Sequence, residues 1–432
     1  MRAEVVVVGA GMFGSAAAKY LSRAGADVLV IGPESPDRDE AAPLSSYGAH
    51  LDEARIVRRL GWDRLWGTLD ARSADRLPAL EAESGVEFFA ECGALALMGK
   101  GVRDRTREML RLCAAGGIVV EELSTAALGR EFPHLGVPPV AGGVDGLLER
   151  RSAGYLHPRL MVRAQLDLAM RAGVRLMRGA VTAVRKAGRA GPWILHADVD
   201  GREAQVETER VLVATGALIN RTDALPPGRE LDLQAFTEPN LLFEVAEAQL
   251  DRLRTLPTVV VVDPEDTGND NLSAYLLPPV RYPDGKWYMR IGPGMQPLVR
   301  ELRTTAESLS WCAAHTVTRE QDLFLRNAMR VLVPTLEPVS VRTACCVVDK
   351  TPTRSPYIGA LDGDDGLSVV VGGNGHGARG SDEIGRLAAT LVLGETWDFP
   401  LPPDVFTPKW RTRATGPETG RPDYLTPPFG LC

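Results

Sequence analysis

The segment Val5-Val-Val-Val-Gly-Ala-Gly-Met-Phe-Gly14 decides the fold that we expect for this chain. Four valines form an apolar run of strand length, three glycines follow at the spacing GxGxxG, and Ser15 to Ala24 has helical character. A second apolar run, Val28–Ile31, completes a βαβ unit of about 30 residues. The sequence therefore predicts the first half of a doubly wound sheet.

Each of the three glycines has a defined task in a turn that binds a dinucleotide. Gly9 permits the tight turn, Gly11 lets the backbone approach a pyrophosphate, and Gly14 lets the helix pack on the strand. The N-terminus of the helix offers free N–H groups to phosphates, and Met12 and Phe13 of the turn are expected among the cofactor contacts. Glycine turns also occur as plain structure, but this turn follows a strand and precedes a helix, which favours a bound dinucleotide.

An acidic residue that binds the adenosine ribose is expected at the end of the second strand. The chain has Gly32-Pro-Glu34 there, and Glu34 can reach the ribose from two residues further on. Alternatively, a backbone contact or a water molecule replaces this contact, and Glu34 is a loop carboxylate exposed to solvent. The sequence leaves both interpretations open.

Length and composition describe an ordinary globular protein. The 432 residues are enough for two interleaved domains, because single cores stop growing at about 250–300 residues. Lys+Arg 49 against Asp+Glu 56 gives a net charge of -7, which argues against nucleic acid and anionic membranes as partners. No stretch approaches the ~20 apolar residues of a membrane-spanning helix, and the first residues carry no export signal.

The cysteines and histidines indicate neither a disulfide framework nor a metal site. The six cysteines show no CxxC spacing. Cys312 and His315 are close in sequence, but no second pair follows that would complete a zinc site. We therefore expect a cytoplasmic protein without a metal.

The pattern of apolar runs divides the chain into two interleaved domains. Short runs between Val174 and Val213 return to the first sheet and end in Ala214-Thr-Gly216. Residues 236–340 have strand patterns of their own, with Pro283-Asp-Gly285 as a hairpin turn, whereas the pattern from Ala54 to Met109 is mostly helical. We expect a nucleotide-binding domain at 1–80, 145–230 and 335–399, a mostly antiparallel substrate domain at 81–144 and 231–334, and a proline-rich tail at 400–432.

Two segments near the C-terminal end indicate the chemistry. They are Thr343-Ala-Cys-Cys-Val-Val-Asp-Lys-Thr-Pro352 and Gly372-Gly-Asn-Gly-His-Gly-Ala-Arg379. Further motifs precede them in a specific order and spacing: Gly9–Gly14, Ala54-Arg-Ile-Val-Arg58, Arg130-Glu-Phe-Pro133, Gly154-Tyr-Leu-His-Pro158 and Ala214-Thr-Gly216.

With these motifs the chain resembles the D-amino-acid oxidase and sarcosine oxidase superfamily of flavoenzymes, over about residues 4–395. It is most similar to the monomeric sarcosine oxidase branch. The resemblance implies FAD as the cofactor and an α/β fold of the glutathione-reductase type. In that fold a Rossmann-like FAD-binding domain is interleaved with an antiparallel-sheet substrate domain.

The resemblance also implies which residues contact the flavin. A cysteine placed like Cys346 carries the flavin through a thioether in that branch, and Cys346 fits better than Cys345 because Lys350-Thr-Pro352 follows at the family spacing. The alternative is that both cysteines are small buried residues on a strand. Further cofactor contacts are expected at Val181, Thr215, Gly216, Gly373, Gly375 and Gly377.

Charged residues of the motifs are candidates for substrate and flavin contacts. Arg55 matches a family arginine placed against the flavin, and Arg58 matches one that pairs with a substrate carboxylate, which suits a planar guanidinium. The alternative is a basic helix exposed to solvent. His376 matches a histidine close to the flavin ring, although a lone histidine is more often structural. Arg379 stands where a family lysine helps to hold the substrate carboxylate and the cofactor.

Three positions depart from the family pattern. Arg290 stands where the sarcosine oxidase branch has a lysine that promotes reaction of the reduced flavin with oxygen, and its bulky fork cannot be deprotonated. Val348 and Gly294 replace a pocket tyrosine and a histidine. These differences put oxygen as electron acceptor in doubt and indicate a pocket that is not built for sarcosine.

We therefore expect FAD-dependent oxidation of a C–N bond in an amino acid, or in a secondary or N-methyl amine with a carboxylate. The product is an imine, and electrons pass to O2 with formation of H2O2. The alternatives are a flavin amine dehydrogenase with another acceptor, a flavin-binding subunit of a larger complex and, more distantly, a nicotinamide dehydrogenase. The partner is a small molecule, and the chain is expected to be a monomer or a homodimer.

Overall fold

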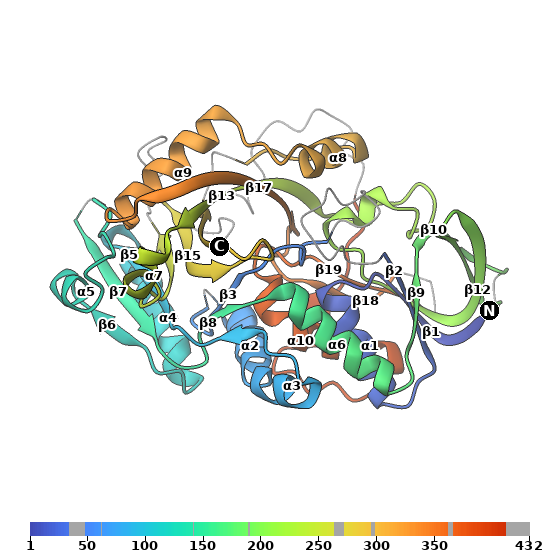
Figure 1. Ribbon diagram of the computed structural model, residues 1–432. Coiled ribbons are helices and arrows are strands. Elements are labelled where there is room, and N and C mark those ends of the chain that lie inside the picture. Colours follow the sequence, from blue (N-terminus) through green and yellow to red (C-terminus); the bar gives the residue numbers. More distant parts are fainter. Residues whose placement is uncertain are drawn as a thin grey trace.

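The structure is a computed structural model (Figure 1). It describes residues 1–33, 48–61, 63–140, 142–188, 191–262, 272–294, 299–361 and 366–411. Glu34, which we predicted as a ribose contact, lies outside the described residues. The part of the tail from residue 412 onward also lies outside them.

The first sheet contains the parallel strands that the valine run predicts. β1 pairs in parallel with β2 and with β12, and β12 pairs in parallel with β19. β10, β11 and β12 form an antiparallel meander at one side, and β9 extends the other. The strands are β1 (Arg2–Val8), β2 (Val28–Gly32), β9 (Arg175–Arg178), β10 (Ala180–Lys186), β11 (Trp193–Val199), β12 (Arg202–Val213), β18 (Tyr357–Ala360) and β19 (Leu367–Val371).

Both faces of this sheet are buried, which is why β1 reads as a continuous valine run. Val5 and Val7 pack under helices α1 and α10, whereas Val6 and Val8 belong to the core on the opposite face. In Figure 1 the helices α1, α6 and α10 lie side by side, and contacts join α1 with both of the others. The helices on this side are α1 (Met12–Arg23), α2 (Arg64–Ala74), α3 (Leu77–Ser84), α6 (Pro158–Arg171) and α10 (Gly377–Leu393).

The second sheet is mostly antiparallel, as expected for a substrate domain. Its order is β17-β13-β16-β15-β14-β5-β7-β6, and only β14 and β5 run in parallel among these neighbours. Tyr282 and Gly285 close the predicted hairpin turn between β15 and β16. The strands are β5 (Ala94–Gly99), β6 (Glu121–Leu123), β7 (Val144–Glu149), β13 (Gln234–Val245), β14 (Thr258–Val262), β15 (Ala274–Arg281), β16 (Trp287–Pro293) and β17 (Pro338–Lys350).

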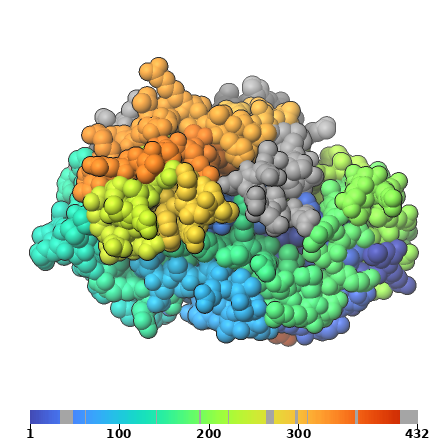
Figure 2. Space-filling view, in the orientation of Figure 1, coloured from blue at the N-terminus to red at the C-terminus, as the bar shows by residue number. Residues whose placement is uncertain are grey.

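Further helices belong to this half of the molecule, and α9 packs against β13, β15 and β16. In the space-filling view the yellow and orange segments of this half lie above the blue and green segments of the first half (Figure 2). The helices are η2 (Lys100–Val102), α4 (Arg103–Ala115), α5 (Thr125–Glu131), α7 (Glu247–Leu253), α8 (Thr305–Ala314) and α9 (Arg319–Leu332). Two short helices lie elsewhere, η3 (Gly216–Arg221) and η5 (Pro403–Phe406).

The mostly helical pattern predicted between Ala54 and Met109 is wrong in part. This stretch contains β3 (Arg55–Val57), β4 (Phe89–Ala90) and β5 in addition to helices. β3 and β4 pair with β8 (Gly154–Leu156) in a small third sheet. All six residues of β5 are buried, and a short run of buried apolar residues does not show by its periodicity whether it is a strand or a helix.

Sheet membership departs from two of the predicted domain boundaries. β7 and β17 pair within the second sheet, although the boundaries near residues 145 and 335 place them with the nucleotide-binding domain. β17 stays paired with β13 up to its last residue, Lys350, and Asp349 near that end also contacts the turn after β19. The division into domains stays a prediction.

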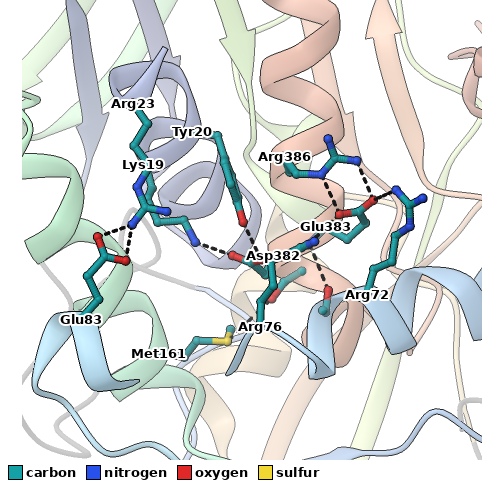
Figure 3. Close-up of polar contacts among 12 residues, drawn as sticks. Lys19, Tyr20, Arg23, Arg72, Arg76, Glu83, Met161, Asp382, Glu383 and Arg386 are labelled. Carbon is teal, nitrogen blue, oxygen red and sulfur yellow. Dashed lines mark hydrogen bonds and ion pairs between the residues drawn. The ribbon is translucent and has the colours of Figure 1, made fainter. Parts of the chain in front are cut away.

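A buried cluster of charges joins α1, α10 and the end of α2 (Figure 3). Lys19 donates to Oδ1 of Asp382 at 2.5 Å, while Tyr20 and Arg76 donate to Oδ2 at 2.8 and 2.6 Å. Glu383, which is fully buried, pairs with Arg72, Arg76 and Arg386. The cluster therefore ties together the two helices that begin at the two glycine motifs.

Candidate active site

A cavity lies at the carboxyl ends of β1, β2 and β12, where an open α/β sheet binds its ligands. It extends to β17 of the second sheet, so both halves of the molecule form its wall. The lining includes Val8–Phe13, Ile31–Pro33, Gly48–His50, Arg55, Gly179–Val181, Ala214–Leu218, Thr222, Ala224, Glu238, Cys346–Asp349, Gly373, Gly375, Gly377 and Ala378.

The first glycine motif has the geometry that a dinucleotide needs. Gly9 has φ +109°, and a Cβ there would lie 2.5 Å from the carbonyl oxygen of Ala214. A Cβ on Gly14 would lie 1.9 Å from the oxygen of Gly9, so this glycine brings α1 close to the strand. Gly11, Met12 and Phe13 line the cavity at the N-terminus of α1, and Gly11 makes no side-chain cap for the first N–H groups. A pyrophosphate therefore fits this end of the cavity.

The two C-terminal segments bind each other. The carboxylate of Asp349 accepts the N–H of Gly372 at 3.1 Å and that of Asn374 at 3.2 Å. Lys350 donates from Nζ to the oxygen of Asn374 at 2.6 Å. A Cβ on Gly377 would come within 2.9 Å of the Phe13 ring, so the late glycine turn lies against the first one.

Most of the predicted cofactor contacts come together in the cavity. The cavity-lining residues among them are Gly9, Gly11, Met12, Phe13, Arg55, Val181, Thr215, Gly216, Cys346, Gly373, Gly375 and Gly377. Gly14 lies behind the turn, and Arg379 lies in the first turn of α10. The roles of these residues remain predictions.

Cys346 faces the cavity, and its neighbour does not. The guanidinium of Arg55 donates from Nη2 to Sγ of Cys346 at 3.2 Å. Burial raises the pKa of the Cys346 thiol, while the charge of Arg55 lowers it. The thiol of Cys345 instead donates to the carbonyl oxygen of Thr316 at 3.7 Å and packs beside a small apolar core. Cys345 is thus a partly buried strand residue with a packing role, whereas the contacts of Cys346 favour a chemical role.

Arg290 is held inside a buried polar network. Its side chain is 2% exposed and forms an ion pair with Asp52. It also donates from Nε to Asn240 at 3.1 Å and from Nη2 to the hydroxyl of Tyr275 at 3.0 Å. Asp52 pairs with Arg55 as well, at 2.5 Å. Burial acts to raise the pKa of Asp52, but Arg290 and Arg55 outweigh it and hold that pKa well below its usual range.

Arg58, His376 and Arg379 form a second polar group. Arg379 donates from Nε to Oδ2 of Asp70 at 2.6 Å, and its Nη2 lies 2.8 Å from Nδ1 of His376. Burial, Arg379, Lys350 and Arg58 together lower the pKa of His376 well below its ordinary value. Arg58 is 2% exposed and follows β3, so the alternative of a solvent-exposed basic helix is wrong.

The four residues predicted as catalytic are therefore brought into two groups. Arg58, His376 and Arg379 lie together, and Arg290 lies with Arg55. All four stand behind the described lining of the cavity rather than in it.

Sequence reasoning missed the carboxylates that hold these arginines. They are Asp52 and Asp70. A third carboxylate, Glu238, lines the cavity and accepts a hydrogen bond from Tyr275. A weak signal existed for Asp52, which precedes Arg55 by three residues. Asp70 carries no motif, and its ion pair with Arg379 spans 309 positions of the chain.

Comparison with known proteins identifies the family. The model of the FAD dependent oxidoreductase family matches residues 4–391. The chain belongs to the FAD dependent oxidoreductase family. The superfamily, the α/β fold class and the FAD cofactor that we predicted are thereby confirmed, and the chain is an FAD-dependent oxidoreductase.

Individual relatives cover almost the whole chain. N-methyl-L-tryptophan oxidase of Salmonella dublin is 24% identical over 405 residues, which is 93% of this chain and 98% of that enzyme. The structure of NikD, an unusual amino acid oxidase essential for nikkomycin biosynthesis, matches with a TM-score of 0.72 at 20% identity, over 95% of this chain and 98% of NikD. L-proline dehydrogenase from P. horikoshii matches with a TM-score of 0.71 at 18% identity, over 94% and 96% of the two chains. At these identities the structural matches concern the fold alone. Among the described residues, no helix is long and apolar enough to cross a membrane.

Proposed function

We propose that this enzyme oxidises the C–N bond of an amino acid, or of a secondary or N-methyl amine that carries a carboxylate. The main support for this proposal is the group of buried arginines beside the FAD cavity, because a guanidinium can bind a carboxylate through two parallel hydrogen bonds. The names of the relatives agree with this proposal, since N-methyl-L-tryptophan is an N-methyl amino acid. FAD, when bound, accepts the hydride equivalent from the carbon beside the nitrogen.

The residues of the chain position the substrate and adjust the charge around it. Arg58 and Arg379 anchor the carboxylate, which orients the adjacent C–N bond. Two of the five N–H donors of Arg379 have partners in Asp70 and His376, and these contacts fix the direction of its fork. Burial of the substrate amine disfavours its charged ammonium form. The amine must lose this proton before oxidation.

We propose O2 as the electron acceptor, with release of H2O2. The ion pair between Arg290 and Asp52 supports an alternative, in which another molecule accepts the electrons. Asp52 compensates the positive charge of Arg290, so this position does not present an isolated cation to the cofactor. A dehydrogenase that passes electrons to a quinone or a carrier protein is compatible with this arrangement. Peroxide formation in air with a turnover substrate, set against reduction of an added quinone, distinguishes the two.

We also propose that FAD is attached covalently through Cys346. The support is the position of its thiol in the cavity wall and the contact with Arg55, because a cation beside a thiol favours the reactive thiolate. Denaturing the holoenzyme in acid tests this. Flavin fluorescence should stay with the precipitated protein, and flavin that washes away would exclude the thioether.

The remaining proposals concern the enzyme as a whole. We propose a cytoplasmic monomer or homodimer whose partner is a small molecule, with FAD-binding segments at 1–80, 145–230 and 335–399. The free cysteines Cys92, Cys113, Cys312, Cys345 and Cys346 support a reducing compartment. A flavin-binding subunit of a larger complex is the alternative, and turnover by the purified chain alone decides between them.

A further inference from the structure

We propose that Asp70 and Arg379 are positioning residues that hold His376 as a neutral imidazole with its proton on Nε2, so that this histidine donates a hydrogen bond and does not act as a general base. The proposal rests on the proposed amine oxidation. It concerns the part that His376 plays at the same site.

The chain of contacts has one chemically consistent direction. Asp70 is fully buried, and its Oδ2 accepts from Nε of Arg379 at 2.6 Å. Nη2 of Arg379 lies 2.8 Å from Nδ1 of His376. A guanidinium has five donors and no acceptor, so Nδ1 must be the acceptor of this bond. In a neutral imidazole the proton then belongs to Nε2.

The surroundings of His376 oppose a second proton on the ring. The charged groups around it are Arg379 on its own helix, Lys350 at the end of β17 and Arg58 after β3, all of them cationic. Asp70 on α2 is the counter-charge, and it acts through Arg379. An imidazolium would place a second positive charge against Nη2 and break the bond from Arg379. The neutral ring is therefore the stable form.

Packing keeps the ring in this orientation. The indole of Trp66 lies 5.1 Å from the imidazole, centroid to centroid, at 54°. Trp66 is itself held by its Nε1, which donates to the carbonyl oxygen of Arg354 at 2.8 Å. His376 is the N-cap residue of α10, between Gly375 and Gly377 of the cavity wall. Its one lone pair is used by Arg379, so Nε2–H is the remaining hydrogen-bonding group of the ring.

NMR of the holoenzyme labelled with 15N-histidine tests the proton position directly. The chain has six histidines, and a His376→Gln variant assigns the ring in question. We expect His376 to remain neutral with the proton on Nε2 from about pH 6 to about pH 9, although free histidine titrates near 6.5. A ring that titrates in this range, or that carries its proton on Nδ1, would overturn the proposal.

Variants of the two positioning residues supply the matched comparison. In Arg379→Met we expect His376 to populate both tautomers and to titrate within about one unit of 6.5, and Arg379→Lys, which restores a donor, should suppress this titration. Asp70→Asn is the second variant in case Arg379→Met does not fold. It should change the 15N chemical shift of Nδ1 of His376 at constant pH. Spectra that are unchanged in both variants would refute the positioning role.

Kinetics separate a donor from a base. Glutamine still offers an N–H, so His376→Gln should keep kcat within about tenfold, whereas loss of a general base costs about 10²–10⁴. A loss of that larger size, together with loss of an acidic limb from the pH profile of kcat, would show a base. Failure of every amine as substrate would instead refute the proposed function, because the NMR result does not depend on turnover.

Discussion

Cys345 and Cys346 are neighbours in the sequence, but successive side chains of a strand point to opposite faces. Cys346 lines the cavity beside Arg55, while Cys345 contacts Thr316 on the other side. Family spacing singled out Cys346, which is the cysteine that lines the cavity. It could not predict Asp52 or Asp70, because the arginines that they hold, Arg290 and Arg379, come from distant parts of the chain.

The two cysteines provide a matched pair of variants. We expect Cys346→Ser to abolish flavin that survives acid precipitation and Cys345→Ser to leave it unchanged. Arg55→Met should reduce the covalent fraction severalfold, because the buried thiol loses the cation that favours its thiolate, and one pKa unit changes the thiolate population about tenfold. Flavin fluorescence of each protein on a denaturing gel measures this. Loss of the covalent flavin in Cys345→Ser instead would contradict the assignment.

A second prediction at this scale concerns Asp70. Burial raises its pKa to about 6, although Arg379 lowers it. The native state thus holds this proton more tightly than the unfolded chain does, so the stabilisation is complete below about pH 4 and is lost as the pH rises through 6. Relative to Asp70→Asn, the wild type should lose on the order of 2–3 kcal/mol of unfolding free energy between about pH 4 and pH 7. Urea unfolding at several pH values measures the difference, and parallel pH curves for the two proteins would refute it.

At the scale of elements, the glycine motifs follow from the sequence, because glycine is the only residue that permits these close approaches. The start of α1 does not follow as well, because the helical pattern begins at Ser15 whereas the helix begins at Met12. Gly14→Ala would place a Cβ 1.9 Å from the oxygen of Gly9. We expect this variant to be purified with less than about a tenth of the wild-type flavin, since α1 must move away from the strand to accept the methyl group. Gly129→Ala is the control, because nothing lies within 4 Å of its new Cβ on α5. The ratio of flavin to protein absorbance reports the outcome, and a full flavin content in Gly14→Ala would be inconsistent with the turn described above.

The charge cluster between α1 and α10 makes a prediction about stability. Asp382→Ala leaves Lys19 buried without its carboxylate, which should cost about 3–5 kcal/mol of unfolding free energy. Asp398→Ala removes an ion pair of Arg386 in which the carboxylate side chain is 58% exposed, and should cost less than about 1 kcal/mol. Chemical denaturation compares the two variants. Equal losses would mean that the cluster in Figure 3 does not hold the two helices together.

At the scale of the whole molecule, the two glycine motifs lie more than 350 residues apart in the chain and meet at one cavity. The order of motifs predicted this meeting, since it matched a family whose fold is interleaved. The sequence did not predict that β17 pairs with β13 of the second sheet. Strand pairing depends on long-range contacts that local patterns do not contain. Cys346 lies on β17 of the second sheet and lines the cavity at the end of the first, so the cofactor site that we propose depends on both halves of the molecule.

The most direct test of the proposed reaction is anaerobic reduction of the purified holoenzyme by paired amines. One member of the pair is N-methyl-L-tryptophan, and the other is N-methyltryptamine, which lacks the carboxylate. We predict that the carboxylate-bearing amine bleaches the flavin absorbance and that its partner does so at least about 100-fold more slowly, because a charge-assisted contact worth about 3 kcal/mol is lost. Sarcosine and L-proline extend the series to smaller amino acids. A flavin that dithionite reduces but that no carboxylate-bearing amine bleaches would contradict amine oxidation at this site.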